Sequence, residues 1–433
     1  MAIVLTDNIH YKNIANAIRA KNGSTEKYQP ADMSLAIEAL DNRRGSIITK
    51  DVNFYDYDGT LLYSYTLEEA QALSRLPPLP TRDGLICQGW NYDLATIKSY
   101  NRLVNIGAIY ITNDGKTRIH LTLEDGRLSP KLGICPDGTV EIDWGDGTNH
   151  DILTGTSVNS VKWTPTHEYA SAGEYIIKLT VVGSMGFYGA STSNQYSGIL
   201  RYSSGGDTRN YVYRNAVQKI EIGTGVTRIG DYAFSTCQSL SSIIIPNGVT
   251  YIGTYAFNNC YSLNSIVIPN SVVDIKSHAF NNCDALGTVI IPNGAKIIGT
   301  QIFYDCYSLR NIVIPDSVTS IESHAFHNCY ALSSLTIPDK VTSIETYAFY
   351  NCYSLSSLVI PSGIKSIGIN TFYNCYSAGY YDFSSHTFVP TLLNYNAFTG
   401  IPSDCRIRVP TELYDKWILA SNWSKYTDYI EAV

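Results

Sequence analysis

The sequence has little charge. Asp, Glu, Lys and Arg make up 16% of its 433 residues, and the formal net charge is −7. Binding to a phosphate backbone needs a basic surface, which this composition lacks, so no nucleic-acid partner is expected. No apolar run reaches the ~18 residues of a membrane span, and membrane insertion is not expected either. The first residues hold neither a basic nor an apolar stretch of the secretory-signal kind, so we expect no export by that route.

Tyrosine, in contrast, is abundant. The chain has 34 Tyr but only 12 Phe and 5 Trp. A buried tyrosine hydroxyl must find a hydrogen-bond partner, which makes tyrosine an unusual choice for the bulk of a core. We therefore expect many of the tyrosines on the surface.

A repeat of about 23 residues runs through the second half of the chain. It is marked by one series of cysteines and one of phenylalanines. The cysteines are Cys237, Cys260, Cys283, Cys306, Cys329, Cys352 and Cys375, and the phenylalanines are Phe234, Phe257, Phe280, Phe303, Phe326, Phe349 and Phe372. Repeats of this length are typical of solenoids, in which each unit is one coil. No single coil can bury its apolar face, so the units must stack.

One unit, CYSLNSIVIPNSVVDIKSHAF, shows how a coil is expected to fold. Leu263, Ile266 and Ile268 face inward from a strand, and Pro269 ends that strand because it has no N–H to donate. Stacking in register puts cysteine on cysteine at an inward site, where a thiol packs as a small apolar group. We therefore expect a buried thiol ladder rather than disulfides or a metal site, and no cofactor.

The repeat carries the pattern I-P-x-x-V-x-x-I-x-x-x-A-F-x-x-C-x-x-L. It resembles leucine-rich repeats of the BspA-like type over about residues 216–377, and the resemblance implies a solenoid of 23-residue coils. Two units have Ile302 or Thr371 where the others have Ala before Phe, and their coils are expected to bulge slightly.

The remaining chain divides into five predicted segments. These are a helical attachment module at residues 1–45, a β-rich domain of unassigned fold at 46–135, a β-sandwich at 136–185, a Gly/Ser/Tyr-rich connector at 186–215, and a degenerate repeat with a C-terminal cap at 378–433. The cap is expected to contain an amphipathic helix through Leu413, Trp417 and Leu419. The predicted fold class is therefore mainly β, with a C-terminal solenoid and a short N-terminal helical hairpin.

Two of these segments carry resemblances of their own. Residues 1–45 resemble N-terminal modules in tail proteins of phages and prophages of Gram-positive gut bacteria; alternatively, their helices pack on the next domain. The motif W-G-D-G-T at Trp144 and the motif H-x-Y-x-x-x-G-x-Y from His167 resemble a PKD-type β-sandwich domain. Asp143 and Asp146 of the first motif could hold calcium, but hydrogen bonding within the turn is favoured.

Two patterns suggest chemistry, and both are weak. The stretch NFYDYDGTLL resembles the first motif of haloacid-dehalogenase-like phosphatases, in which Asp56 would be the nucleophile and Asp58 the acid/base. Those enzymes need a doubly wound sheet, whereas the chain that follows is mostly strand and turn. His324 and His327 on one coil hint at zinc, but no fourth ligand is apparent. We assign no catalytic and no metal-binding residues, and predict that the protein is not an enzyme.

The variable positions of the repeat predict a binding surface. Three positions vary between units, and they lie two residues before Phe, one after Phe and one after Cys. The residues at these positions are predicted to form outward stripes of aromatic side chains mixed with Asn, Gln, Ser and Asp. The aromatic members are Tyr232, Tyr255, His278, His324, Tyr347, Tyr304, His327, Tyr350, Tyr373, Tyr261, Tyr307, Tyr330, Tyr353 and Tyr376. The polar members include Ser235, Asn258, Asn281 and Asp284. The outward strand positions show no such mixture of aromatic and polar residues. They include Ser242, Ser265 and Thr288, with Ile, Val or Thr between.

Tyrosine mixed with serine and asparagine is the composition of antibody binding loops. Exposed rings also suit stacking on sugars. The other interpretation is that stacked rings only stabilise the edge of the solenoid.

We therefore predict a modular, non-enzymatic binding protein. The setting implied by the resemblances is the tail of a phage or prophage, assembled in the bacterial cytoplasm as part of the virion. The repeats would recognise a bacterial surface protein or glycan, and the N-terminal module would contact other tail or baseplate proteins. The alternatives are a secreted or surface-anchored bacterial adhesin and, less favoured, the phosphatase.

Overall fold

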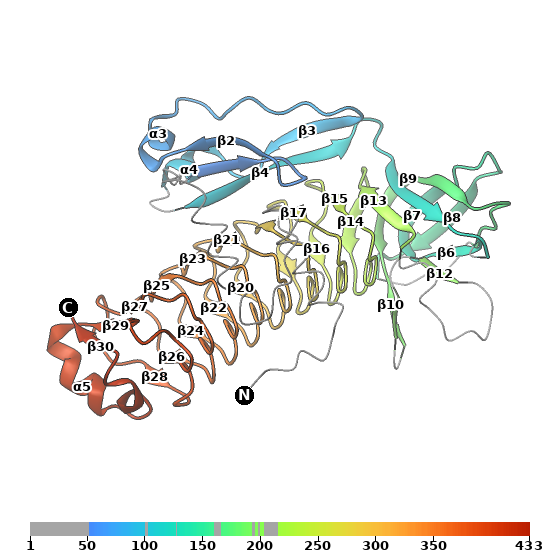
Figure 1. Ribbon diagram of the computed structural model, residues 1–433. Coiled ribbons are helices and arrows are strands. Elements are labelled where there is room, and N and C mark those ends of the chain that lie inside the picture. Colours follow the sequence, from blue (N-terminus) through green and yellow to red (C-terminus); the bar gives the residue numbers. More distant parts are fainter. Residues whose placement is uncertain are drawn as a thin grey trace, which may run out of the picture.

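The chain folds into a small sheet, a second sheet and a long solenoid (Figure 1). The computed structural model describes residues 52–99, 103–126, 128–159, 166–192, 195–197, 200–202 and 215–433. The predicted helical module at residues 1–45 lies outside the described residues. The mainly β class is confirmed: about 7% of the structure is helical, and the solenoid has about nine turns.

The first sheet is mixed and four-stranded, in the order β2-β1-β4-β3. Its elements are β1 (Val52–Tyr55), β2 (Leu61–Tyr65), α3 (Leu67–Ala72), β3 (Leu85–Trp90), α4 (Leu94–Ser99) and β4 (Val104–Thr112). β1 pairs with β4 in parallel, whereas the two outer pairs are antiparallel. Helix α3 begins at a capping box, in which the Glu69 amide donates to Thr66 Oγ1 and the Thr66 amide donates to Glu69 Oε2.

The second sheet covers the first coil of the solenoid. Its strands are β5 (Thr117–Leu123), β7 (Ile134–Asp143), β8 (Asp151–Thr156) and β9 (Gly173–Phe187). β9 pairs with β5 and β7, and its end pairs with β14 (Val226–Ile229) of the first coil. β5 in turn pairs with β13 (Val217–Glu221) of the same coil. Because these pairings satisfy the edges of the first coil, the second sheet acts as the lid at that end of the stack.

These pairings correct two predicted segment boundaries. The boundary at residue 135 falls inside β7, and β5 belongs to the same sheet as β7 and β9 although it was placed in the preceding segment. The connector at 186–215 contains the end of β9 and three short strands. These are β10 (Ala190–Thr192), β11 (Gln195–Ser197) and β12 (Leu200–Tyr202), and β12 pairs with β6 (Pro130–Leu132). Alternation predicts strands, but it does not say which strands pair.

The W-G-D-G-T and H-x-Y motifs meet in the second sheet. Trp144 stacks on His167 with ring centroids 4.8 Å apart, and the Tyr169 hydroxyl donates to the Trp144 carbonyl over 2.8 Å. Asp143 Oδ1 accepts from the Gly145 amide, which confirms the predicted hydrogen bonding in the turn. Burial opposes ionisation of Asp146, but hydrogen bonds from Thr148 and His167 prevail and lower its pKa to about 2.

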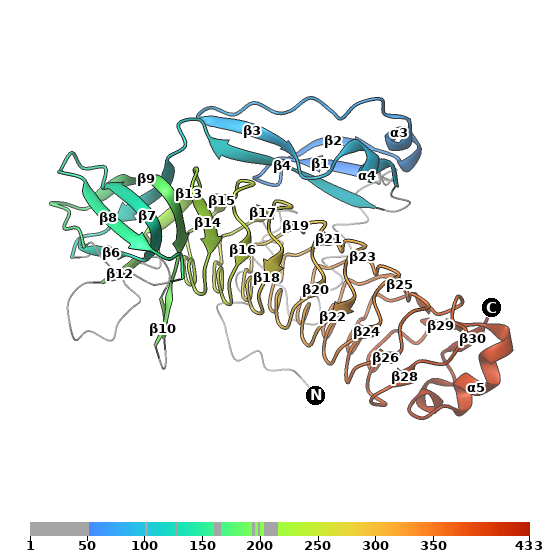
Figure 2. The same ribbon diagram turned by 180° about the vertical axis from the view of Figure 1, so that it is seen from behind.

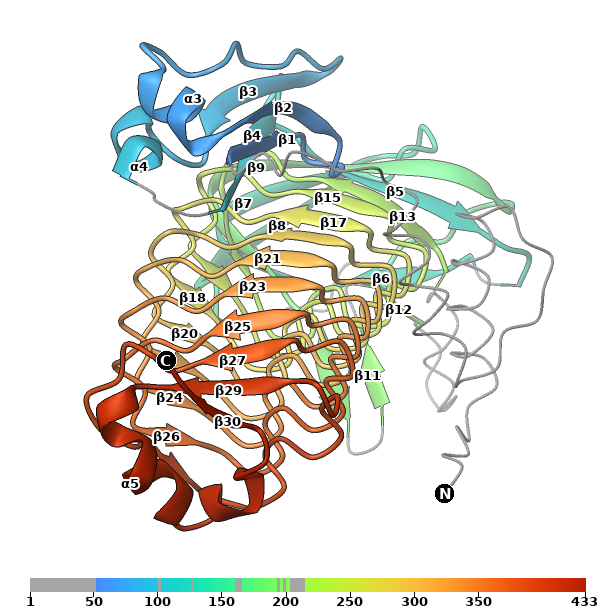
Figure 3. The same cartoon turned by 60° about the vertical axis from the view of Figure 1, so that its left-hand side comes forward.

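Each coil of the solenoid has two short strands and a turn, which give the stack three sides (Figure 3). The first strand face consists of β13, β15 (Ser242–Ile244), β17 (Ser265–Val267), β19 (Thr288–Ile290), β21 (Asn311–Val313), β23 (Ser334–Thr336), β25 (Ser357–Val359), β27 (Tyr380–Asp382) and β29 (Arg406–Val409). The second strand face consists of β14, β16 (Tyr251–Ile252), β18 (Asp274–Ile275), β20 (Ile297–Ile298), β22 (Ser320–Ile321), β24 (Ser343–Ile344), β26 (Ser366–Ile367) and β28 (Thr391–Leu392). The third side, here called the turn face, holds the residues around each Phe and Cys of the repeat. We number the coils from one at β13 and β14.

The predicted core of the solenoid is confirmed. The repeat phenylalanines are at most 1% exposed, and successive rings lie 5.3–5.7 Å apart. The repeat cysteines are buried, and from coil two onward each thiol donates to the Phe carbonyl of the preceding coil over 3.1–3.5 Å. The thiol ladder therefore satisfies a row of carbonyls as well as filling space.

The C-terminal cap closes the other end of the stack. It contains η2 (Thr411–Leu413), α5 (Tyr414–Leu419), η3 (Trp423–Tyr426) and β30 (Ile430–Ala432). Trp417 and Trp423 are fully buried against Phe383. Leu419, which was expected on the apolar face of the helix, is 81% exposed because α5 ends at that residue. None of the helices in the described ranges is long and apolar enough to span a membrane.

The first sheet lies against the first strand face of the solenoid (Figures 1 and 2). Strand β4 runs across β15, β17, β19 and β21. Four hydrogen bonds fix the position of the sheet. Ser265 Oγ donates to the Tyr57 carbonyl, the Asn247 amide donates to Gln88 Oε1, Asn270 Nδ2 donates to the Asn91 carbonyl, and the Tyr92 hydroxyl donates to the Ile291 carbonyl. The outward strand positions, which were not predicted to belong to the binding surface, therefore form an intramolecular interface.

This interface has a continuous apolar centre. Ile109 packs on Val267 and Ile290, and Tyr110 packs on Ile244. A Cβ atom on Gly107 would lie 2.9 Å from Ile290 Cδ1 and closer still to Val267 Cγ1, so the backbone of β4 lies directly on these two side chains. The sheet and the solenoid thus pack as one body over coils two to five.

Candidate binding surface

The turn face is built around two left-handed residues in each coil. The first lies two residues before Phe and the second lies just before Cys. The first group is Tyr232, Tyr255, His278, Gln301, His324, Tyr347 and Asn370, with φ of +52° to +62°, and the second is Thr236, Asn259, Asn282, Asp305, Asn328, Asn351 and Asn374, with φ of +57° to +63°. These positions reverse the chain tightly enough for the next strand to begin.

Local structure explains the second group. Asn and Asp tolerate positive φ better than other non-glycine residues. Their side chains also form a ladder: Asn351 Nδ2 donates to Asn328 Oδ1, and Asn374 Nδ2 donates to Asn351 Oδ1, over 2.8 and 2.9 Å. This polar ladder needs no partner molecule to account for it.

Local structure does not explain the first group. A left-handed conformation costs about 1–2 kcal/mol for a residue other than Gly, Asn or Asp. Asn370 shows that asparagine fits this position, yet Tyr232, Tyr255 and Tyr347 occupy it in other coils. The rings must therefore contribute something that asparagine cannot, either by stacking on one another or by binding a target.

The aromatic side chains stack into columns along the solenoid axis. The first column runs through Tyr232, Tyr255 and His278 and resumes at His324 and Tyr347; the second runs through Tyr304, His327, Tyr350 and Tyr373; the third runs through Tyr307, Tyr330, Tyr353 and Tyr376. Neighbouring centroids in a column are 4.3–5.2 Å apart. Tyr261, the remaining predicted residue, is half-buried on coil two and is followed in its column by Asp284.

The first two columns join over coils four to seven. His324 lies 5.4 Å from His327, and Tyr347 lies 5.3 Å from Tyr350, between ring centroids. We call this surface the aromatic wall; it consists of Tyr304, His324, His327, Tyr347, Tyr350 and Tyr373. The structure thus brings six of the fourteen predicted residues into one cluster, whereas Tyr232, Tyr255 and His278 form the part of the first column on coils one to three, outside the wall.

Stacking decides what the wall presents to solvent. Its rings are half-buried, because each ring face covers the next and leaves mainly edges and polar atoms outside. In the third column, Tyr330 is buried at 8% exposure, and Tyr376 at the end of the row is 45% exposed. The wall therefore offers ring edges rather than the open ring faces on which a sugar would stack.

Several polar residues predicted to lie in the stripes do not face outward. Ser235, Asn258, Asn281 and Asp284 are all buried. Their side chains are too short to reach past the stack of turns, and Asn258 Nδ2 instead donates to Ser235 Oγ. The surface aromatic residues are thus concentrated toward the C-terminal coils, which the average repeat pattern does not reveal.

The wall is uncharged near neutral pH. Burial, with a contribution from His324, lowers the pKa of His327 to about 3, and burial lowers the pKa of His324 as well. Burial raises the pKa of Tyr304 and Tyr350. Recognition at this surface would therefore depend on shape and hydrogen bonds rather than on charge.

The residues that were considered for catalysis or zinc binding make contacts within the fold instead. Asp56 is fully buried and forms an ion pair with Arg82, and Asp58 Oδ1 accepts from the Thr60 amide in the following turn. They belong to the mixed first sheet rather than to a doubly wound one. His324 and His327 stack within the wall, and across the described ranges no group of three or more His, Cys, Asp or Glu could hold a metal ion.

Comparison with known proteins agrees with this architecture. The fold defines a leucine-rich-repeat solenoid with a candidate binding surface. Residues 208–333 and 296–413 match the family described as BspA type leucine rich repeat region, in six copies. Among curated proteins, none matches the chain.

Solved structures with similarity to the chain are also leucine-rich-repeat proteins. The leucine-rich repeat protein of T. pallidum is 29% identical, with a TM-score of 0.35, over 44% of this chain and 87% of that one. A leucine-rich repeat protein of Eubacterium ventriosum is 28% identical, with a TM-score of 0.32, over 43% of this chain and 41% of that one. A leucine rich cell surface protein of Faecalibacterium prausnitzii is 26% identical, with a TM-score of 0.23, over 44% of this chain and 74% of that one.

Proposed function

We propose that this protein is a non-catalytic binding protein and that the aromatic wall contacts its target. The observation that carries the proposal is that His324 and Tyr347, in the part of the wall where two columns join, occupy left-handed positions at which asparagine would fit the backbone at lower cost. Six rings then form one uncharged surface at a definite place on the solenoid. Rigid aromatic side chains give a large contact area at little cost in conformational entropy.

The chemistry of the wall favours a target with many hydrogen-bonding groups. Its ring faces are covered by one another, so edges, hydroxyls and imidazole nitrogens remain for contact. We propose a bacterial surface protein or glycan as the target, and the edge-on presentation favours the protein. A glycan would bind through its hydroxyl groups and not by stacking.

The proposed setting is the tail of a phage or prophage. It is supported by the resemblance of residues 1–45 to tail-protein modules, which would contact other tail or baseplate proteins. The PKD-like interpretation of residues 136–185 fits a spacer in such an assembly. The second candidate, a bacterial surface adhesin, would use the same wall.

The test uses the full chain, because β5 and β9 complete the first coil and an isolated solenoid would expose it. The double variant Tyr347→Asn, Tyr350→Asn removes the centre of the wall with a residue that occurs at both repeat positions, as Asn370 and Asn258. The matched control is Tyr232→Asn, in coil one and outside the wall. Binding is measured to intact Gram-positive gut bacteria and to a glycan array.

We expect saturable binding that the double variant weakens at least tenfold and that the control leaves unchanged. Thermal unfolding of both variants should stay cooperative, which shows that the fold is intact. Equal binding by the wild type and a folded double variant would refute the role of the wall and would favour the purely structural interpretation of the rings.

A further inference from the structure

The solenoid is open at one joint of its second strand face. At the other joints backbone hydrogen bonds cross between coils, as from the Lys276 amide to the Ile252 carbonyl over 3.0 Å and from the Glu322 amide to the Ile298 carbonyl over 2.9 Å. The equivalent bonds between coils three and four would run from Lys296 to Val273 and from Gly299 to Ile275. Both are absent from the described solenoid, and β18 and β20 do not pair.

Equivalent glycines confirm that these coils are splayed apart. A Cβ atom at Gly253 would lie 2.5 Å from the Asp231 amide nitrogen, and one at Gly368 would lie closer still to the Thr346 nitrogen. At Gly299, in the same repeat position, the nearest atom is Ser277 Cα at 3.8 Å. The joint is therefore wider here by more than 1 Å.

Coil four departs from the repeat at two inward sites, and one of them, Ala295, lines the opening. Ile302 occupies the inward site that holds Ala in most other coils, yet the turns stay paired there: the Phe280 amide donates to the Ile302 carbonyl over 3.0 Å, and the His278 amide donates to the Thr300 carbonyl over 3.0 Å. Ala295 occupies a site that otherwise holds Val or Ile, and its small side chain leaves space on the second strand face. The residues at the first site are Ala233, Ala256, Ala279, Ala325 and Ala348, and those at the second are Val249, Val272, Val318, Val341 and Ile364. The bulge expected at Ile302 therefore does not separate the turns, and coil four is displaced only on the second strand face, beside Ala295.

The other exception behaves differently. Thr371 hydroxyl donates to the Gly368 carbonyl, and the second strand face stays paired at that coil.

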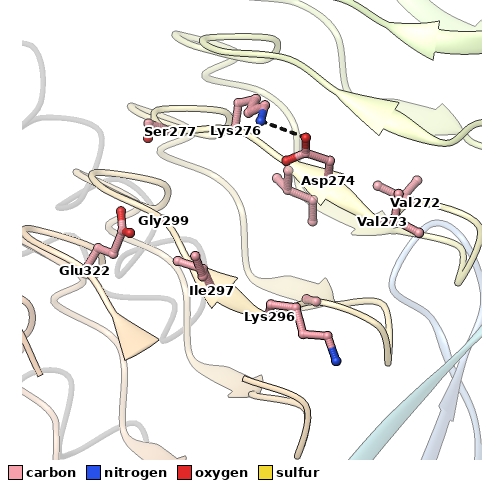
Figure 4. A pocket seen from close by; sticks show the side chains of 11 residues that line it. Val272, Val273, Asp274, Lys276, Ser277, Lys296, Ile297, Gly299 and Glu322 are labelled. Carbon is pink, nitrogen blue, oxygen red and sulfur yellow. Dashed lines mark ion pairs between the residues drawn. The ribbon is translucent and has the colours of Figure 1, made fainter. Parts of the chain in front are cut away.

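The opening has an apolar floor and a polar rim (Figure 4). Its volume is about 220 Å³. Ile275 lines the opening and is only half-buried, whereas the inward isoleucines of the other coils are at most 1% exposed. Val273 and Ile297 flank it at 70% and 47% exposure, and an Asp274–Lys276 ion pair lies at the rim.

We propose that this opening is a binding site for one apolar side chain carried on an extended peptide. The volume suits a single ring, since a cavity of about 150 Å³ holds benzene. The walls present the Val273 and Ile275 carbonyls on one side and the Lys296 and Gly299 amides on the other. A peptide carries both complementary groups, because each residue has one N–H donor and one C=O acceptor.

The site is tested by titrating the full chain with N-acetyl-phenylalaninamide, which carries one ring between two amide groups, and with toluene, which carries the ring alone. Binding is followed by the methyl signal of Ile275. Ala295→Val restores the residue of the neighbouring coils and should fill the opening. Ile297→Ser restores the usual outward residue, as at Ser320, and leaves the core intact. Thr342→Val, an exposed change two coils away, is the matched control.

We expect saturable binding of the amide, at least tenfold tighter than toluene. Ala295→Val should weaken it at least tenfold and Ile297→Ser several-fold, whereas Thr342→Val and the double variant of the aromatic wall should leave it unchanged. If Ala295→Val does not fold, Ile297→Ser decides the question. Absence of saturable binding, equal affinity for toluene, or binding insensitive to the rim variant would each overturn the proposal.

Discussion

Replacing Gly107 by alanine should weaken the packing of the first sheet on the solenoid. The new Cβ would lie 2.9 Å from Ile290 Cδ1 and closer still to Val267 Cγ1, whereas carbon atoms pack at about 3.5–4.0 Å. Overpacking of this kind costs about 1–3 kcal/mol, and the lower entropy of the unfolded chain returns about 0.4–1 kcal/mol. We expect a net loss of roughly 1–2 kcal/mol in the free energy of unfolding.

The assay combines urea unfolding with hydrogen exchange of the full chain. Exchange should rise on both sides of the interface, in β3 and β4 and in β17 and β19, and should stay constant in the C-terminal cap. The matched control is Gly248→Ala, whose Cβ would meet only the Val226 carbonyl oxygen at 3.5 Å. Adding Val267→Ala to Gly107→Ala makes room for the new methyl group and should recover part of the loss. Unchanged stability and exchange in Gly107→Ala would refute the close approach of the β4 backbone to Val267 and Ile290.

Three further outcomes are expected. Between about pH 6.5 and pH 3 His327 is protonated in the unfolded chain but not in the folded chain. The free energy of unfolding should therefore fall as the pH falls, by up to about 1.4 kcal/mol per pH unit. His327→Tyr should flatten this dependence in urea titrations at pH 7, 5 and 4, and an equal dependence in the wild type and the variant would contradict the argument. Of the ten cysteines, nine are buried and Cys87 is partly exposed, so a thiol reagent should label at most one per native chain, and faster labelling of several would show that the coils open. Tyr347→Asn should change the free energy of unfolding by less than about 1 kcal/mol, since asparagine tolerates positive φ better than tyrosine and this gain offsets the lost stacking. Tyr350 has no positive φ, so Tyr350→Asn should lower the free energy of unfolding by more, as measured by urea unfolding.

The sequence was sufficient for the solenoid because a strict period leaves little freedom. With Leu263, Ile266 and Ile268 repeated in every unit, only one stacking register buries them all. The same register placed the cysteines inside and the variable positions on the turn face.

The sequence was not sufficient for the surfaces. The average pattern placed Asn258 and Asp284 in the same stripes as the tyrosines, but a short side chain at these positions stays buried and a ring does not. The interface on the first strand face could have been predicted from the sequence. Ile244, Val267 and Ile290 are apolar at outward positions, and a row of exposed apolar residues marks a surface that packs against another part of the protein or a partner.

The sequence by itself thus determined the coil, its core and the row of aromatic positions, because neighbours in a repeat are set by the repeat length. Only the tertiary structure decided which face is covered by the first sheet, which rings join into the wall and how far coils three and four are splayed. Those features depend on contacts between segments of unrelated sequence, such as Gly107 with Val267, and on small differences in side-chain volume summed across neighbouring coils.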